Sequence, residues 1–306
     1  MITRRAFLSS LAVTAAGSVL HANVNANWFS KLYHIGIADS LVRSHAQGDE
    51  AAQLNQSMTQ VFETPGQPKC QFEFASTLSL AERLRQSQIH LMVCPGIEYA
   101  WMKSKFPDLL PLVVAQRNDI RMKACVVVRN ESKARKISDL RNASISLPER
   151  LPQHAYLFIN QKIASQGAES AGFFQQSLLP ADSNEGIESV IEEKADAILL
   201  DQDAWLGYQE QKSARSKKLR VLEESISFPT AVVLHHRETW NKLEIPLLRV
   251  ALCAAHQKPL ARQILNYWGV SRFVTSKTEY QQIVEDFLCE MPEPIKLADI
   301  VAKSTK

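Results

Sequence analysis

Short apolar runs alternate along the chain with longer segments in which apolar residues recur every three or four positions. Runs of five or six residues rich in Val, Ile and Phe are typical of strands, and the longer recurrence is typical of amphipathic helices. The runs at 90–94 and 195–201 are apolar almost throughout, which predicts strands buried on both faces. The predicted strands are 33–38, 71–75, 90–94, 112–115, 125–129, 143–147, 195–201, 219–222 and 230–234.

Helices are predicted between these strands. The segment Ser79-Leu80-Ala81-Glu82 has the Ser-x-x-Glu spacing of a capping box, so we expect a helix that opens there and runs through Arg85. A polar turn is expected at 137–140. The other expected helices are 46–62, 99–105, 152–165 and 184–194, and 246–288 is expected to be mainly helical.

This alternation of strands and helices predicts an α/β fold with mostly parallel sheets flanked by helices. Two such series, with a return to strand near 220–234, predict two lobes joined by two crossings of the chain. Lobe 1 is expected to contain 27–118 and 230–306, and lobe 2 to contain 119–229. Ligands of open α/β sheets bind beyond the carboxyl ends of the strands, so we expect a ligand cleft between the lobes that closes about a hinge.

Residues 1–26 are predicted to be an export signal that is removed after Ala26 or Ala22. Arg4 and Arg5 precede a weakly apolar stretch, which is too short and too mild to span a membrane. The residues around the two arginines resemble the twin-arginine signal of bacteria, which predicts export to the periplasm. A plain secretory signal with two incidental arginines is the alternative.

Composition narrows the class of protein. The 306 residues are 45% hydrophobic and 22% charged, and 35 basic residues face 32 acidic ones. This near balance gives no electrostatic case for binding nucleic acid, which requires a basic stripe. The five cysteines contain no Cys-x-x-Cys pair, which excludes a zinc ribbon and a thioredoxin-like redox motif. We interpret all five as structural, with one disulfide compatible with the sequence and none required.

The usual catalytic motifs are absent from the sequence. It contains no Gly-x-Ser-x-Gly elbow, no His-Glu-x-x-His, no P-loop and no Gly-x-Gly-x-x-Gly. His235 and His236 end a predicted strand and would point to opposite faces, so we expect a solvated strand end there and no metal site. The basic run from Lys212 to Arg220 is expected to be a solvated loop. No cofactor and no metal are expected.

Five segments occur in the order and spacing of a known family. They are Gly36–Ser40, Ile89–Tyr99, Ile137–Arg141, Ala195–Asp201 and Trp268–Phe273. In these segments the chain resembles the periplasmic phosphonate/phosphite-type substrate-binding proteins of ABC importers, which have the two-lobe type II periplasmic binding fold. The resemblance covers about residues 32–288. It implies a monomer that is not an enzyme and that delivers a small polar, anionic, phosphonate- or phosphate-like ligand to an inner-membrane permease.

One family segment differs here. The family holds the phosphonate oxygens with a hydroxyl-rich loop that opens a helix of the second lobe, and the matching residues 149–155 contain no hydroxyl. Arg150, Gln153 and His154 in this segment can still donate hydrogen bonds to an oxyanion. Ser183 falls where the family has a His. Tyr99 and Asp201 are retained, and the resemblance implies that Asp201 meets an amino group on an aminophosphonate-type ligand.

The ligand-binding residues that we expect lie at predicted strand ends and helix starts. They are Asp39, Ser40, Thr77, Glu98, Tyr99, Arg150, Gln153, His154, Ser183 and Asp201. Several have a structural alternative: Asp201 as a helix cap, Tyr99 as a packing residue, Asp39 and Ser40 as turn formers, Glu98 as a solvent-exposed residue, and Gln153 and His154 as surface residues.

Two other functions remain open from the sequence. One is a sensory module that presents its bound ligand to a membrane kinase. The other is an exported enzyme that uses Asp201 and His154 as an acid/base pair.

Overall fold

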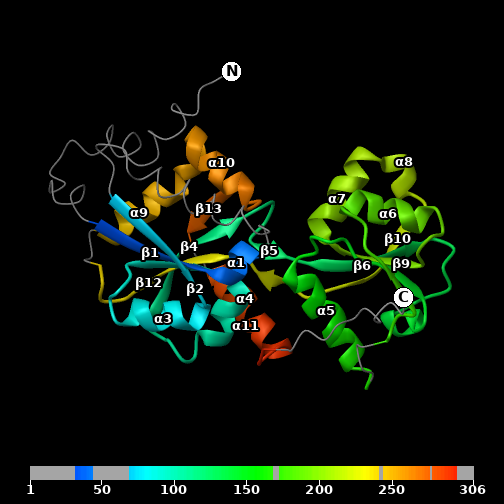
Figure 1. Cartoon of the computed structure of the whole chain (residues 1–306), viewed down its shortest axis with the longest axis horizontal. Coiled ribbons are helices and arrows are strands. Elements are labelled where there is room, and N and C mark those ends of the chain that lie inside the picture. The colour runs from blue at the N-terminus through cyan, green and yellow to red at the C-terminus, as the bar shows by residue number, and fades with distance from the viewer. Residues whose placement is uncertain (1–31, 44–68, 168–171, 241–243, 276–277, 295–306) are drawn as a thin grey trace. The chain divides into compact units, whose positions relative to one another are not determined.

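The structure is a computed structural model, and it describes residues 32–43, 69–167, 172–240, 244–275 and 278–294 (Figure 1). The expected export signal and the expected helix at 46–62 lie outside the described residues. The described chain divides into two compact units. The first contains the residues up to Arg121 together with Pro229–Pro292, and the second contains Met122–Phe228 together with the described residues from Glu293.

The first unit is built on a six-stranded mixed sheet. Its strands β3, β1 and β2 are parallel neighbours, whereas β12 is antiparallel to both β3 and β4, and β13 is antiparallel to β4. The strand order is β13 (Arg272–Thr275), β4 (Leu109–Gln116), β12 (Val232–His236), β3 (Leu91–Cys94), β1 (Leu32–Ala38) and β2 (Lys69–Ala75).

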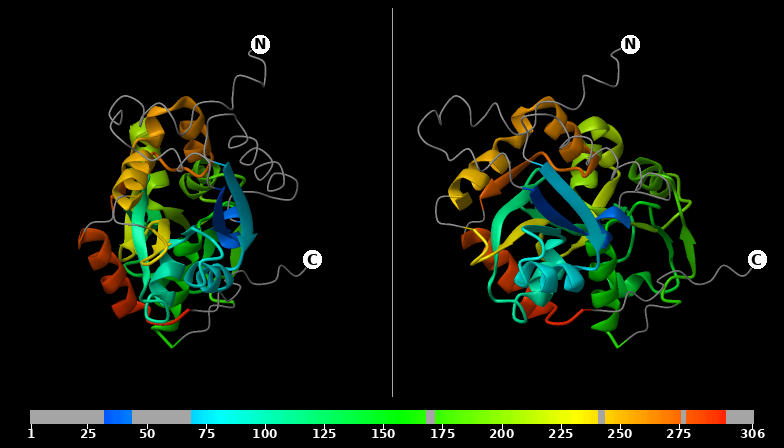
Figure 2. Two further views of the ribbon diagram at one scale, coloured as in Figure 1. Left: turned by 90° about the vertical axis from the view of Figure 1, so that its left-hand side faces the viewer. Right: turned by 60° about the vertical axis from the view of Figure 1, so that its left-hand side comes forward.

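Helices cover both faces of this sheet. In Figure 1, α9 and α10 lie above it and α3, α4 and α11 lie below it, and Figure 2 shows the same two layers from other sides. Tyr33 and Ile35 are two positions apart in β1, so their side chains point to the same face of the sheet. On that face they pack with α9, through Ile245, Leu248 and Leu252. The helices are α1 (Asp39–Arg43), α3 (Thr77–Arg85), α4 (Gly96–Met102), α9 (Glu244–Cys253), α10 (Pro259–Tyr267) and α11 (Thr278–Glu290), with a 3-10 turn at Ala255–Gln257.

The second unit contains a five-stranded mixed sheet. Strands β9, β7 and β8 are parallel neighbours, while β6 runs antiparallel to β9 and β10 runs antiparallel to β6. The order is β10 (Leu219–Glu224), β6 (Ala124–Arg129), β9 (Ala197–Asp201), β7 (Ser144–Ser146) and β8 (Gln176–Leu178). Its helices are the 3-10 helix η3 (Ile137–Leu140), α5 (Gln153–Ala164), α6 (Ser183–Ile191), α7 (Gln202–Gln211) and α8 (Ser213–Ser216).

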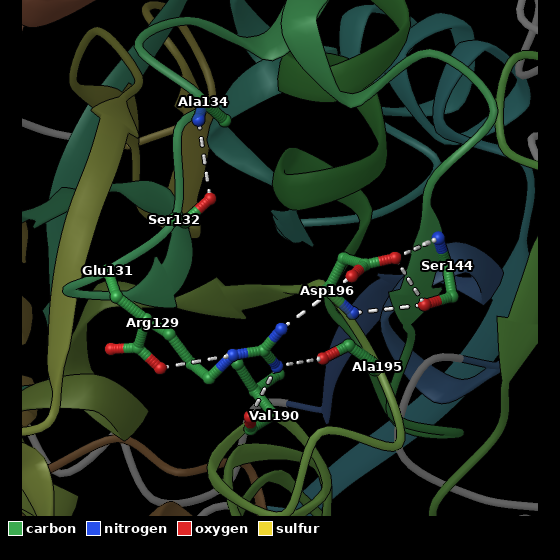
Figure 3. Close-up of polar contacts among 8 residues, drawn as sticks. All are labelled: Arg129, Glu131, Ser132, Ala134, Ser144, Val190, Ala195 and Asp196. Atoms are coloured by element: carbon green, nitrogen blue, oxygen red, sulfur yellow. Dashed lines mark hydrogen bonds and ion pairs between the residues drawn. The ribbon is translucent and has the colours of Figure 1, made fainter.

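Arg129, the last residue of β6, ties the amino end of β9 to the final turn of α6 (Figure 3). Its Nη1 donates hydrogen bonds of 2.9 Å to the carbonyl oxygens of both Val190 and Ala195. The neighbouring Asp196 carboxylate accepts from the backbone N–H of Ser144 at 2.8 Å and from its hydroxyl at 2.7 Å. These bonds fix the register of β7 and β9 at the end where the strands begin.

The chain passes between the units at three points, Arg121/Met122, Phe228/Pro229 and Pro292/Glu293, and short strands lie at the first two. The short strands β5 (Arg121–Met122) and β11 (Phe228–Pro229) pair with each other there. Among the described helices, none combines the length and the apolarity needed to cross a membrane. All five cysteines are free thiols, and Cys94 and Cys125 are buried.

The α/β fold and the buried strands at 90–94 and 195–201 are confirmed, but several details of the expectation are wrong. The sheets are mixed instead of mostly parallel. In the first unit β4 is antiparallel to both of its neighbours, β12 and β13, and in the second unit β6 is antiparallel to β9. The segment 246–288 is mainly helical as predicted, and it also contains the four-residue strand β13. The helix expected from Ser79 begins at Thr77, because Ser76 is its N-cap and accepts a hydrogen bond from the Ser79 N–H.

Candidate functional site

In the first unit, three helices begin at one edge of the sheet. The parallel strands β3, β1 and β2 are neighbours, and each is followed directly by a helix: α4, α1 and α3. The carboxyl ends of the three strands therefore lie side by side, and so do the first turns of the helices. Five of the expected ligand-binding residues lie in these first turns: Asp39, Ser40, Thr77, Glu98 and Tyr99.

The structure brings Thr77 and Glu98 together. Thr77 is the first residue of α3 and is 8% exposed, and its Oγ1 donates a hydrogen bond to Glu98 Oε2. Glu98 lies in the first turn of α4 and is half-buried, so the solvent-exposed alternative for it is wrong. The nearby Cys94 thiol has a raised pKa because it is buried and because Glu98 is negative. The pair joins the first turns of two helices that follow β2 and β3.

Ser40 and Tyr99 have different surroundings at this edge. The Ser40 hydroxyl is buried and has no hydrogen-bond partner within the described residues, although its residue is only half-buried. A buried hydroxyl without a partner is costly, so a ligand atom that it could reach would be favoured. Tyr99 is 4% exposed, and burial followed by the nearby Cys94 raises its pKa to about 12. The tyrosine is thus a neutral packing side chain of α4.

The second unit has the same construction. Its parallel strands β9, β7 and β8 are neighbours, and the chain continues from their carboxyl ends into α7, α5 and α6. Gln153 and His154 are the first residues of α5, Ser183 is the first residue of α6, and Asp201 is the residue that precedes α7. Arg150 lies in the loop between β7 and α5 and is exposed. All five expected residues of this unit therefore lie at one edge of its sheet.

Asp201 is the N-cap of α7. Its Oδ1 accepts a hydrogen bond of 2.9 Å from the backbone N–H of Asp203, and the side chain is only 11% exposed. The helix-cap alternative for this residue is therefore correct in structural terms. Its second carboxylate oxygen lies 3.8 Å from His154 Nε2.

His154 is a buried residue, so the surface alternative for it is wrong. It is 2% exposed, its Nε2 lies 3.3 Å from the carbonyl oxygen of Lys123, and its ring contacts Phe228 at a centroid distance of 5.5 Å. The neighbouring Gln153 remains half-buried. Of the two donors at the start of α5, Gln153 is the one that is accessible to a ligand.

Sequence reasoning missed the residues around Ser183. A surface cavity between the start of α6 and the middle of α7 is lined by Asp182, Ser183, Asn184, Ala204, Gly207, Tyr208 and Gln211. Asp182 caps α6 through the Glu185 N–H at 2.9 Å, and Glu185 accepts in return from the Ala181 N–H at 2.9 Å. The Asp-x-x-Glu spacing in the sequence is the signal that could have identified this helix start.

Two further expectations concern histidines and metals. The expected solvated strand end at His235 and His236 is wrong, since both are buried in β12, which lies between β3 and β4 in the sheet. Burial lowers the pKa of His235, against the opposing effect of a hydrogen bond with the His236 backbone. Within the described ranges, no three side chains of His, Cys, Asp or Glu form a group that could hold a metal ion.

Two solved structures share the fold of this chain at TM-scores above 0.5, and a third is similar at a lower score. XAC2383 from Xanthomonas citri bound to chloride ion has a TM-score of 0.52 at 15% identity, covering 85% of this chain and 96% of that chain. The same protein bound to ATP gives a TM-score of 0.51 at 15% identity, with the same coverage. PhnD1 from Prochlorococcus marinus in complex with methylphosphonate gives 0.47 at 14% identity, covering 85% of this chain and 99% of that chain.

No curated protein matches the sequence. A family profile does match it, over residues 44–280, and the profile is described as ABC transporter, phosphonate, periplasmic substrate-binding protein. The match covers most of the chain, including the strand edge of the second unit and the ends of β2 and β3 in the first unit, whereas Asp39 and Ser40 precede it. The chain therefore belongs to the family of periplasmic substrate-binding proteins of phosphonate ABC transporters.

Proposed function

We propose that this protein binds a small oxyanion of the phosphonate or phosphate class and passes it unchanged to the permease of an ABC importer. The observation that carries this proposal is the convergence of helix starts at a strand edge in each unit. The first backbone N–H groups of a helix have no acceptor within the helix, and the helix dipole is positive there. An anion is the ligand that such an edge favours.

The side chains at these edges support a ligand that accepts hydrogen bonds. Ser40 and Ser183 carry hydroxyls, Gln153 carries an amide, and Arg150 carries a guanidinium that can form a fork with two oxygens of one anion. Asp39, Glu98 and Asp201 are acidic, and they favour a ligand that combines its oxyanion with a positively charged or hydrogen-bond-donating group. The resemblance to phosphonate binders is consistent with such a ligand.

An enzymatic use of His154 and Asp201 is less well supported. The side chains are close, but His154 is buried against Phe228 and the Lys123 carbonyl oxygen, and Oδ1 of Asp201 accepts the α7 cap hydrogen bond. A general acid or base must reach its substrate directly or through one water. Binding without chemistry also agrees with the family to which the chain belongs.

The family is periplasmic, and we propose that residues 1–26 export this member by the twin-arginine route. Replacing Arg4 and Arg5 by Lys should leave the precursor in the cytoplasm, since the arginine pair is read by a receptor. Continued export through the general secretory machinery would contradict that route.

A thermal-shift screen tests the ligand class. The probes are inorganic phosphate, methylphosphonate, 2-aminoethylphosphonate, methanesulfonate and acetate. A ligand at 100 times its dissociation constant stabilises the folded state by about 2.7 kcal/mol. In a chain of this size, that corresponds to a rise in melting temperature of roughly 4–5 °C. We expect the phosphorus oxyanions to give the largest rise, and a rise with acetate alone would contradict the proposal.

A matched pair of variants locates the effect. Ser183→Ala removes a hydroxyl at the start of α6, at the strand edge, whereas Ser213→Ala removes one from α8, away from that edge. The anion-induced shift should shrink in Ser183→Ala and persist in Ser213→Ala. An equal shift in both variants would remove Ser183 from the binding site.

A further inference from the structure

A cluster of basic side chains lies at the end of the second unit opposite to its candidate ligand edge. The cluster consists of Lys133, Arg135, Lys136, Lys217 and Lys218, here called the basic face, and all five residues are exposed. The register places it: Ala124 of β6 pairs with Asp201, Val128 pairs with Ala197, and Arg129 pairs with Leu219 of β10. The loop before β10 and the first residues after β6 therefore lie at the amino end of β9, away from Asp201. Arg135 and Lys136 follow along β10, where the next residue, Ile137, donates its N–H to Glu223.

Hydrogen bonds hold these two loops together. Asn130 donates from its side chain to the Lys217 carbonyl oxygen at 2.6 Å and from its backbone to the Lys218 carbonyl oxygen at 2.9 Å. Arg220 Nη2 donates to the carbonyl oxygens of Ser132 at 3.0 Å and Ala134 at 2.5 Å. Figure 3 shows the same loop leaving Arg129 through Glu131 and Ser132 to Ala134. These bonds hold together the two loop backbones that carry the basic face, although the loops are far apart in the sequence.

Few acids neutralise this arrangement. Glu131 is engaged by Arg129, with 3.5 Å between Oε1 and Nε, and the Asp139 carboxylate accepts the backbone N–H groups of Arg135 and Lys136. No ion pair within the described chain engages the side chains of Lys133, Lys217 or Lys218. The whole chain has a formal charge of only +3, so this local excess is a strong asymmetry.

The composition of the basic face favours a lipid surface over a protein. Protein interfaces are depleted in Lys and depend on buried aromatic or apolar anchors. The exposed large apolar residues among the described ones are Leu32, Leu78, Leu179, Leu206 and Val250, and none belongs to these loops. Clusters of four to eight Lys and Arg, by contrast, are typical of segments that bind anionic lipids.

We infer that the basic face is an electrostatic docking surface for an anionic phospholipid bilayer. Docking there leaves the edge with Asp201 and Ser183 uncovered, so a ligand can enter or leave while the protein stays near its membrane-embedded permease. This inference does not depend on which ligand the protein binds.

Sedimentation with lipid vesicles tests the inference on the purified full chain. The vesicles contain phosphatidylcholine alone or with about 30% phosphatidylglycerol, and the ionic strength is either about 0.02 M or about 0.3 M. We expect binding only to the phosphatidylglycerol vesicles, and we expect the higher salt to weaken it strongly. Absence of binding to phosphatidylglycerol vesicles at low salt would overturn the inference.

A comparison of two variants with the same net charge separates the contribution of the basic face to vesicle binding from the contributions of net charge and of the N-terminal arginines. The triple variant Lys133→Gln/Lys217→Gln/Lys218→Gln should weaken vesicle binding by about a hundredfold, because each basic residue near an anionic surface contributes about a factor of five. The control Lys103→Gln/Lys105→Gln/Arg237→Gln removes the same charge from the first unit, where each side chain is in a long surface ion pair of 3.7–3.9 Å.

The control should bind vesicles like the wild type, and both triple variants should keep the wild-type melting temperature, since surface ion pairs of this kind contribute little. Equal losses in the two variants, or full binding by the Lys133/Lys217/Lys218 variant, would overturn the inference.

Discussion

His154 and Asp201 lie next to each other at the carboxyl edge of the second unit, with 3.8 Å between Nε2 and Oδ2. The imidazole is buried, and the carboxylate is held by the α7 cap on its other oxygen. The contact joins the start of α5 to the start of α7, and His154 extends it to the Lys123 carbonyl oxygen. These few side chains therefore determine how two of the three helix starts in this unit are held.

The position of His154 predicts a structural role. His154→Ala should lower the free energy of unfolding by about 2–3 kcal/mol, because it leaves a cavity against Phe228 and removes the polar contact with Lys123. The matched change Gln153→Ala, at the half-buried neighbour, should stay within about 0.5 kcal/mol. Urea denaturation of the two variants checks this, and equal effects would contradict it.

We expect the Asp201 carboxylate to distinguish ligands that carry an ammonium group from ligands that do not. Asp201→Asn keeps a residue that caps a helix as well as Asp does, so the melting temperature of the ligand-free protein should change little. The variant has lost a negative charge, so its affinity for 2-aminoethylphosphonate, which carries an ammonium group, should be at least about tenfold lower. Methylphosphonate should lose no affinity. Titration calorimetry with both ligands decides the matter, and an equal change for the two would remove Asp201 from amine recognition.

The sequence was most informative where the local pattern is sufficient. Continuous apolar runs predicted β3 and β9 because both strands are buried on both faces. The positions after strand ends predicted which residues start helices, since caps and first turns depend on local chemistry. This reasoning correctly placed Ser183 and Asp201 at or beside helix starts, whereas the helix expected from Ser79 begins two residues earlier, at Thr77.

Long-range pairing could not be predicted in the same way. The strand β13 is four residues long and forms only because β4, far away in sequence, offers a free neighbour position. His235 and His236 are buried because β12 inserts between β3 and β4, which no local pattern reveals. The contacts of Thr77 with Glu98, and of His154 with Lys123, likewise depend on which strands are adjacent.

The start of α4 has no room for a side chain at Gly96. A Cβ at this position would overlap the carbonyl oxygens of Pro229 and Thr230, which are backbone atoms and cannot move aside easily. Gly96→Ala should therefore destabilise the protein by about 1–3 kcal/mol or more. Gly207→Ala in α7 is the control, since a Cβ there meets no atom within 4 Å and should add up to about 1 kcal/mol through helix propensity. Thermal melts that move in the same direction for both variants would contradict this explanation.

We expect protonation of Glu188 to account for part of the stability that the second unit loses in acid. Burial disfavours its charge, yet hydrogen bonds from Lys212, Tyr208 and Arg215 outweigh burial and lower its pKa below the ordinary 4.5. A lowered carboxyl pKa contributes stability that is present above pH 4.5 and is lost as the pH falls through the folded-state value.

The variant Glu188→Gln should therefore melt below the wild type at neutral pH, and the difference should shrink as the pH drops below about 4. Glu210→Gln, at an exposed position of α7, should follow the wild-type curve throughout. Melting temperatures recorded from about pH 3 to about pH 7 supply the comparison. A constant difference between Glu188→Gln and the wild type across this range would show that the ion pairs of Glu188 are not responsible.

Capture of an oxyanion without chemical change is tested most directly by titration calorimetry followed by recovery of the ligand. Methylphosphonate, or whichever phosphorus oxyanion gives the largest thermal shift, is titrated into the protein, released by denaturation and analysed by phosphorus NMR. We predict saturable binding of one anion per chain and full recovery of the unaltered compound. Failure of every phosphorus oxyanion to bind, or recovery of a converted product, would contradict the proposed function.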